Sequence, residues 1–258
     1  MTYSTRHPVP YFLGSHCGGG SRPPPPPEPC ASLDFETYSE AGFSWDEQRQ
    51  RWVKPPGAPR GGIAACGLAH YAEHESTEVL CLSYKLPGDA DVTHWRPGLE
   101  PPYRLWEHVA RGGLMRAQNV MAERLIWEWV CVRKLGWPPV APEQWRCTMA
   151  TSRVNSLPGG LDAVGSALRL DTTKDKRGKA LLKLLSQPRN PTKKDPRRRI
   201  LPSDDPVAAS ALYAYCDQDV RTEDAVAAAQ PQMTPDELAF WQIDQDINYR
   251  GVAVDRKA

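Results

Sequence analysis

The stretch ASLDFET, residues 31–37, is one of three short strings that carry most of the information in this chain. Its pattern predicts a short strand that enters the core. Because residues two apart in a strand point the same way, the carboxylates of Asp34 and Glu36 should share one side. Leu33 and Phe35 should enter the core on the opposite side. This arrangement suits a bridging metal site, although an Asp-x-Glu pair by itself is also typical of an exposed strand end.

The string QNVMAE, residues 118–123, places another carboxylate where a predicted strand gives way to a helix. Asn119 occupies a natural N-cap position, and Glu123 lies in the first turns of the helix. A carboxylate at that place can lean toward the end of the first strand. Ordinary capping, with a Glu that suits the helix dipole, explains this string equally well on its own.

The string YCDQD, residues 215–219, falls inside a later predicted helix. Tyr215 and Asp219 are one helical turn apart and share a face, so the phenol could orient a water molecule beside a metal-bound carboxylate. Asp217 points about 160° away from Tyr215 and should face elsewhere. For Tyr215 alone, a partly buried tyrosine without a chemical role is the more common explanation.

Together the three strings supply acidic side chains that one folded site can gather around two divalent metal ions. Hard divalent cations prefer carboxylate oxygens, and a pair of such ions is a recurrent means of cutting a phosphodiester by in-line attack of water. The leading hypothesis from the residues is therefore a nuclease.

The rest of the chain alternates strand and helix patterns, which is typical of an α/β fold. Strands are expected at residues 31–37, 63–71, 79–86, 114–117 and 145–149. Helices are expected at residues 102–110, 120–135, 161–168, 206–229 and 235–248. The first three strands should form an antiparallel meander. Asp205 should cap one of these helices, and Thr234 with Glu237 forms a capping box for the last.

Two segments depart from this regular pattern. Residues 38–62 are rich in Pro and Gly and are interpreted as a long loop or insertion, which Trp45 and Trp52 should pack down. Apolar side chains of the last helix, among them Phe240 and Trp241, either form an interaction face or pack back onto their own domain.

Composition allows one large domain or two small ones, because the chain has 258 residues and 40% of them are hydrophobic. The formal net charge of +1 conceals a basic segment between Lys174 and Arg199. Such a segment, interrupted by Pro and Gly, can act as a mobile strap that binds phosphates without reading sequence. A solvated loop is the alternative interpretation.

Cysteine usage and hydropathy indicate the compartment. Seven cysteines without a Cys-x-x-Cys pair are typical of reduced core residues in an intracellular protein. A zinc knuckle of His16, Cys17 and Cys30 is disfavoured by its irregular spacing. No apolar run approaches membrane-spanning length and no signal peptide is apparent, so a cytoplasmic location is expected. Residues 1–29, rich in Gly and Pro, should form a disordered tail.

The order Asp-x-Glu, Asn-x-x-x-acid, Tyr-x-x-x-Asp resembles the three motifs of the 3′-5′ proofreading exonuclease domain of family A, DNA polymerase I-like, DNA polymerases. The version resembled is the DEDDy arrangement of phage-type polymerases, and the similarity covers roughly residues 31–255. It implies an α/β, ribonuclease-H-like fold of the DnaQ-like exonuclease type, with a mixed five-stranded sheet flanked by helices. It also implies an exonuclease domain at 30–230, and at 231–258 a helix like the start of a polymerase domain.

The resemblance assigns roles to individual residues. It implies that two Mg²⁺ or Mn²⁺ ions are held by four carboxylates, those of Asp34, Glu36, Glu123 and Asp219. Tyr215 would position the nucleophilic water. Nucleic-acid contacts are expected from residues near the 3′ nucleotide and from the basic segment, namely Thr37, Gln118, Asn119, Lys174, Lys176, Arg177 and Lys183.

Two departures from the resembled family stand out. The second motif commonly ends in Asp and here ends in Glu123, and the insertion after Glu40 could reshape the substrate entrance. In the resembled polymerases the segment like residues 238–255 is followed by further subdomains, and too little sequence remains here for nucleotide polymerisation. The chain is accordingly interpreted as a free-standing exonuclease, as part of a split polymerase, or as a piece of a larger protein.

The resulting expectation is a metal-dependent 3′-5′ exonuclease that acts on single-stranded or frayed DNA 3′ ends in a bacterial or phage-infected cytoplasm. It would release nucleoside 5′-monophosphates, and a separate polymerase subunit is a further expected partner. One alternative is a catalytically weak module that binds DNA or docks onto a polymerase, which Glu123 keeps open. Another is an RNA 3′-5′ exonuclease, since nothing in the sequence visibly reads a 2′-hydroxyl.

Overall fold

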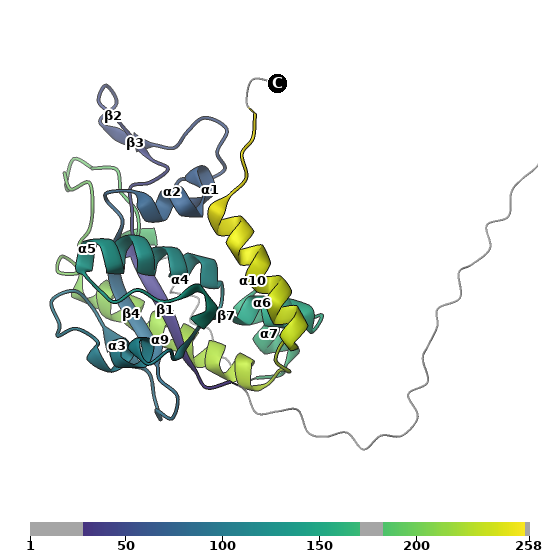
Figure 1. The fold of residues 1–258 in the computed structure, drawn as a ribbon. Coiled ribbons are helices and arrows are strands. Elements are labelled where there is room, and N and C mark those ends of the chain that lie inside the picture. Colours follow the sequence, from purple (N-terminus) through teal and green to yellow (C-terminus); the bar gives the residue numbers. More distant parts are fainter. Residues whose placement is uncertain (1–27, 171–182, 256–258) are drawn as a thin grey trace, which may run out of the picture.

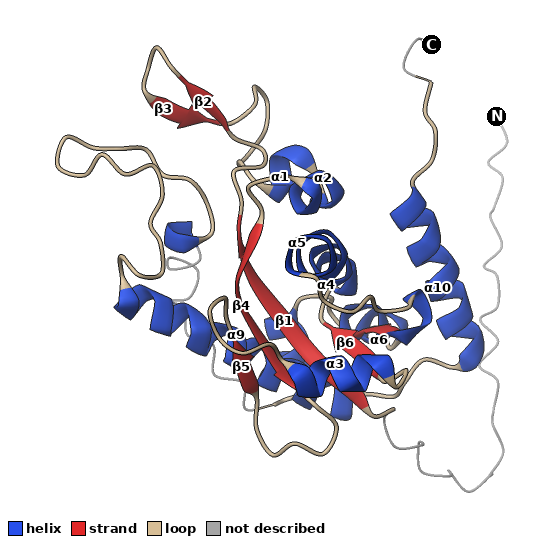
Figure 2. Ribbon diagram, turned by 60° about the vertical axis from the view of Figure 1, so that its left-hand side comes forward, coloured by secondary structure: helices blue, strands red, loops and turns tan. Residues whose placement is uncertain are grey.

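The computed structural model describes residues 28–170 and 183–255. A five-stranded mixed sheet in the order β5-β4-β1-β6-β7 forms its centre, with helices on both faces (Figures 1 and 2). The strands are β1 (Cys30–Tyr38), β4 (Glu78–Lys85), β5 (Thr93–Trp95), β6 (Leu114–Ala117) and β7 (Trp145–Cys147). Strand β4 runs antiparallel to β1 and β5, while β6 runs parallel to β1 and β7. This α/β architecture confirms the expected fold class and is compatible with a ribonuclease-H-like fold.

The helices of the described ranges include five that the sequence predicted. The bounds are α1 (Ile63–Cys66), α2 (Leu68–Glu73), α3 (Tyr103–Ala110), α4 (Val120–Ile126), η1 (Trp127–Val132), α5 (Arg133–Leu135), η2 (Pro142–Gln144), α6 (Thr148–Val154), α7 (Leu161–Ala167), α9 (Pro206–Ala228) and α10 (Pro235–Arg250). The predicted helix 120–135 is continuous, but its middle part, η1, is π-helical. Asp205 caps α9 through the backbone N–H of Ala208, and Thr234 with Glu237 forms the predicted capping box of α10.

One predicted strand is wrong. Residues 63–71 form the two short helices α1 and α2, separated by Gly67 in a left-handed conformation at φ +79°. The run contains three Ala and one Leu, which favour helix, and its burial does not alternate. Tyr71 and Ala72 are buried next to each other, whereas Ile63 is 48% exposed. The meander is completed instead by β5, a three-residue strand that the sequence did not indicate.

The predicted strand 145–149 is shorter than expected. Strand β7 ends at Cys147, and Thr148 already begins α6, which the sequence analysis did not anticipate. The side chain of Cys147 accepts a hydrogen bond from the backbone N–H of Ala150 and so caps this helix. A cysteine is an unusual cap, which explains why the signal was not recognised.

The two faces of the sheet are covered by different helices. On one face Leu33 and Phe35 of β1 lie in the main core, where the Phe35 ring meets Trp127 of η1 at a centroid distance of 6.3 Å. On the other face the long helix α9 crosses β1 and β4, and buries Leu212, Cys216 and Val220. The main core gathers a group of tryptophans, Trp95, Trp127, Trp137 and Trp145.

Residues 38–62 carry a hairpin of β2 (Ser44–Asp46) and β3 (Arg51–Val53) that stands beyond the end of the sheet (Figure 2). The rings of Trp45 and Trp52 meet edge to face at 5.5 Å, so the two tryptophans pack against each other within the hairpin. The segment therefore has internal structure of its own.

Four remaining expectations concern the cysteines, the last helix, membrane spans and the N-terminal tail. The six cysteines within the described ranges are free, and all but Cys66 are buried. Helix α10 packs on the core through Trp241, but Phe240 on its outer side is 74% exposed. No helix in the described ranges is long and apolar enough to cross a membrane. Residues 1–27 of the predicted tail, with His16 and Cys17, lie outside the described residues.

Candidate functional site

Strand β1 places its two carboxylates at an opening in the sheet. Ser32 pairs with Arg116, and β6 ends at Ala117, so Asp34 and Glu36 lie on the part of β1 that extends beyond β6. In open α/β sheets, ligands bind in the crevice outside the carboxyl ends of parallel strands. Leu33 and Phe35 are buried on the opposite side, as the two-residue period requires.

A change of strand register marks the same point of β1. Glu36 pairs with Cys81 and Thr37 with Val79, so the β1–β4 ladder shifts by one residue between Glu36 and Thr37. Such bulges are common next to active sites because they re-aim side chains. The hydroxyls of Thr37 and Tyr71 share a hydrogen bond of 2.9 Å, which holds Thr37 beside the acidic pair.

Helix α9 brings the third string to β1. The Cys216 thiol donates a hydrogen bond of 3.3 Å to the backbone carbonyl of Asp34, which fixes this part of the helix directly over the strand. Burial raises the pKa of Tyr215, and the charge of Asp219 and its hydrogen bond with the Tyr215 phenol raise it further. The predicted shared face of Tyr215 and Asp219 is thus confirmed.

Asp217 faces elsewhere, as predicted. Its carboxylate accepts a hydrogen bond of 2.5 Å from the Ser83 hydroxyl and lies 3.5 Å from Nδ1 of His94. Burial acts to raise the pKa of Asp217, but the contacts with His94 and Ser83 outweigh it and the pKa is lowered. Asp217 therefore attaches α9 to β4 and β5 and takes no part in the acidic group.

The acidic side chains of β1 and α4 share a crowded electrostatic environment. The pKa of Glu36 lies well above its ordinary value because the side chain is desolvated, and because the charges of Asp34, Asp219 and Glu123 repel its own. The pKa of Glu123 is raised well above its ordinary value by burial and by the charge of Asp34. One oxygen of Glu123, Oε2, is buried without a hydrogen-bond partner.

These four carboxylates fit divalent cations by donor chemistry, and the charges of three of them raise the pKa of the fourth, Glu36. As the side chains lie, however, no three His, Cys, Asp or Glu residues within 28–170 and 183–255 are arranged around one point as metal ligands. Coordination of an ion therefore requires rotation of these side chains toward one another. The orphaned Oε2 of Glu123 is an oxygen that such a rotation could supply.

The β6–α4 junction lines the same opening. Asn119 holds the predicted N-cap position of α4, but its side chain makes no capping hydrogen bond. The Gln118 amide donates a hydrogen bond of 2.9 Å to the carbonyl of Gly159, while its Oε1 is buried without a partner. Both side chains thus have hydrogen-bonding capacity that the described part of the protein does not use.

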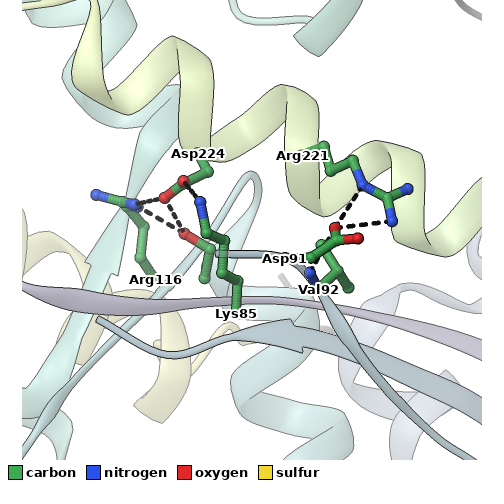
Figure 3. Close-up of polar contacts among 7 residues, drawn as sticks. Lys85, Asp91, Val92, Arg116, Arg221 and Asp224 are labelled. Atoms are coloured by element: carbon green, nitrogen blue, oxygen red, sulfur yellow. Dashed lines mark hydrogen bonds and ion pairs between the residues drawn. The ribbon is translucent and has the colours of Figure 1, made fainter. Parts of the chain in front are cut away.

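A partly buried ion-pair network that the sequence did not indicate holds α9 on the sheet (Figure 3). Asp224 accepts hydrogen bonds from Arg116 at 2.9 Å and from Lys85 at 2.7 Å. Arg116 also donates to the Ser32 hydroxyl at 2.7 Å. Nearby, the buried Glu223 accepts a hydrogen bond of 2.8 Å from Thr148. The network ties β1, β4 and β6 to the helix that carries Tyr215 and Asp219.

The basic segment divides into tied and open parts. Arg189 and Arg197 both pair with Asp195, and Arg199 pairs with Glu78. These cations are therefore anchored within the protein and do not form a mobile strap. Lys183 instead lines an open groove of about 1530 Å³ that also borders Glu36 and Thr37. The other predicted cations, Lys174, Lys176 and Arg177, lie outside the described residues.

Comparison with known proteins identifies a relative of this chain. No family model matches the chain. The chain is 34% identical over 198 residues to a protein named DNA polymerase from Bacillus phage SP02, and the alignment covers 75% of this chain. It spans only 30% of that relative's length. The similarity supports a relationship to a phage DNA polymerase without indicating which activity the shared part carries.

Proposed function

We propose that this chain is a metal-dependent 3′-5′ exonuclease that acts on DNA and releases nucleoside 5′-monophosphates. The observation that carries the proposal is the gathering of acidic side chains from β1, α4 and α9 at the open carboxyl edge of the sheet. Glu36 is acted on by the charges of Asp34, Asp219 and Glu123 together. The relationship to a phage DNA polymerase supports DNA as the substrate.

Four residues would hold the ions, namely Asp34, Glu36, Glu123 and Asp219. Two Mg²⁺ or Mn²⁺ ions bound there would supply an activated water and stabilise the leaving 3′ oxygen. The phenol of Tyr215, held by its hydrogen bond with Asp219, would orient the water for in-line attack. Thr37, Gln118 and Asn119 border the same opening and would contact the terminal nucleotide.

The test is degradation of a 5′-labelled single-stranded DNA by the purified protein with Mg²⁺, Mn²⁺ or EDTA. A metal-dependent ladder that shortens from the 3′ end is expected. Asp34→Ala and Asp219→Ala should lower the rate to background because each removes a metal ligand. Tyr215→Phe should slow the reaction by no more than about 100-fold, the lower end of what a positioned proton-handling group contributes. Glu107→Ala removes an exposed carboxylate of α3 and serves as the control.

Circular dichroism should show that all four variants remain folded. Equal activity in Asp34→Ala, Asp219→Ala and the wild type would rule out this site. Single-strand binding without any metal-stimulated hydrolysis would favour a non-catalytic module. Matched DNA and RNA oligonucleotides in competition separate a DNA exonuclease from an RNA-trimming enzyme, since preferential loss of the RNA would contradict the proposed substrate.

A further inference from the structure

An open groove leads from the acidic edge of the sheet toward the insertion. It starts at Glu36 and Thr37 and runs between residues 43–64 and residues 183–190. Its volume of about 1530 Å³ exceeds the roughly 300–1,000 Å³ of sites for small ligands, so an extended ligand fits it better. In Figure 1 the β2–β3 hairpin and the segment that precedes α9 lie at the same end of the domain.

The two walls of the groove are fastened to each other. The backbone N–H of Trp52 donates a hydrogen bond of 2.6 Å to the Asn190 side chain. The guanidinium of Arg198 lies over the Trp45 ring at 3.6 Å, and the Trp45 ring in turn packs on Trp52. The hairpin and the segment before α9 therefore form one surface, although they are far apart in the sequence.

The lining of the groove combines aromatic rings with cations. Phe43 and Trp52 line it, and both are partly buried. Arg60 and Lys183 line it too, are exposed, and make no ion pair with any residue of the described ranges. The hydroxyl of Ser186, also in the lining, is buried without a hydrogen-bond partner.

The contrast with neighbouring cations is informative. Three cations line the groove, and two of them, Arg60 and Lys183, make no ion pair with a described residue. The third, Arg189, is paired with a carboxylate, as are Arg197 and Arg199 of the same basic segment. Alternating cations and aromatic faces are typical of surfaces that bind single strands, because phosphates meet the cations while unstacked bases lie on the rings. A duplex keeps its bases stacked and cannot use such rings.

We propose that this groove binds the unpaired DNA strand over the nucleotides that precede the 3′-terminal one. Arg60 and Lys183 contact its phosphates, and Trp52 and Phe43 stack with its bases. This inference rests on the proposed exonuclease function and deepens it, because it assigns the strand-binding surface to the insertion. The scissile end of the strand then lies at Glu36, where the groove begins.

Binding of 5′-fluorescein-labelled oligothymidylates of two and eight nucleotides tests the proposal. Fluorescence anisotropy is measured in EDTA on the full chain carrying Asp34→Ala, so that nothing is cleaved. The eight-nucleotide ligand should bind more tightly than the dinucleotide. Trp52→Ala should weaken the eight-nucleotide complex about tenfold, as expected for loss of one stacked base, and the dinucleotide complex less. Trp52→Phe keeps a stacking ring and should retain most of the affinity.

Salt dependence tests the cations independently of the hairpin's stability. Each lost phosphate contact lowers the slope of log affinity against log salt by about 0.7 for single strands, so Arg60→Ala/Lys183→Ala should lower it by about 1.4. Arg49→Ala/Arg51→Ala removes the same charge from the hairpin outside the groove lining and should leave the slope unchanged.

The outcomes separate this inference from the proposed function. Equal affinity for both lengths, or equal losses in the groove and control variants, would overturn the groove. Length-dependent binding that the groove variants abolish would support it, even if the wild type cleaved no DNA. In that last case the exonuclease proposal alone would fail.

Discussion

Removal of the Asp224 carboxylate should destabilise the protein far more than removal of the Asp91 carboxylate. Each carboxylate accepts a hydrogen bond from an arginine, Asp224 from Arg116 of β6 and Asp91 from Arg221 of α9 (Figure 3). Arg116, the partner of Asp224, has a side chain only 8% exposed, whereas Arg221, the partner of Asp91, is 43% exposed. Breaking a buried ion pair by truncating one partner typically costs about 3–5 kcal/mol, because the remaining charge stays buried.

The structure lowers this figure somewhat. The Asp224 side chain is 32% exposed, so water can reach part of the space that Asp224→Ala leaves. Lys85, at 26% exposure, can turn its ammonium toward solvent and should contribute little. Arg116 also keeps its hydrogen bond to Ser32. We therefore expect a loss of about 2–3 kcal/mol, and a melting midpoint about 4–12 °C lower for a domain of this size.

Urea unfolding followed by tryptophan fluorescence measures the effect, since four tryptophans lie in the main core. Asp224→Ala should lower the midpoint with an unchanged slope, while Asp91→Ala should leave the midpoint where it is. Asp224→Asn, which keeps an acceptor for Arg116, should fall between them. Equal midpoints for Asp224→Ala and Asp91→Ala would refute the argument that desolvation of Arg116 sets the magnitude.

Two further predictions concern the insertion and a buried acid. Gly42→Ala should destabilise the protein more than Gly57→Ala. Both positions have a positive φ, at which a side chain costs about 1–2 kcal/mol. Only at Gly42 would the new Cβ also lie close to another group, 2.6 Å from the carbonyl oxygen of Gly62. Equal thermal midpoints would contradict this close approach. Burial raises the pKa of Glu223 to about 7 from 4.5, so the folded state favours the proton and the stability from this group is lost as pH rises through 7. Unfolding in EDTA between pH 5 and 8 should show a decline to which Glu223 contributes roughly 2.5 kcal/mol. Glu223→Gln should reduce the decline by that amount and leave the part due to Glu36 and Glu123, whose pKa values are also raised; an unchanged decline in this variant would contradict the prediction.

Local signals account for the parts of the fold that the sequence predicted. The cap at Asp205, the capping box at Thr234 and the strand pattern of residues 31–37 each act within a few residues, and the predicted caps and strand are present in the structure. Residues 63–71 were misassigned because a short apolar run does not distinguish a strand from two short helices. Strand β5 has only three residues, too few for a period to show.

Long-range contacts explain what the sequence could not supply. Arg116 and Asp224 are 108 residues apart, and Lys85 and Asp224 are 139 apart, so no local pattern connects them. The hairpin wall likewise depends on contact between Trp52 and Asn190, which are 138 residues apart. The candidate site lies between these two cases. Its three strings can be recognised in the sequence, but the opening at which they lie exists because β6 ends at Ala117, before the level of Asp34, and that depends on the pairing of the sheet.

The surroundings of the buried acids distinguish a structural carboxylate from those of the candidate site. Glu223 is buried, yet Arg116 and the Thr148 hydroxyl favour its charged form, so the protein itself compensates part of its charge. The charges that act most strongly on Glu36 all raise its pKa, and they come from Asp34, Cys81, Asp219 and Glu123. Packing therefore holds together groups that repel one another, at the expense of stability.

Such repulsion has a physical use only if something positive enters the site. A divalent cation that binds the folded state alone would relieve the repulsion and stabilise that state by mass action. The same side chains that lower the stability of the metal-free protein would then provide the affinity for the metal. In the proposed site Glu123 would then have a role, although the resembled exonucleases commonly have Asp at this position. Its buried, unpartnered Oε2 is held on α4, and its longer side chain can span the opening beyond the end of β6.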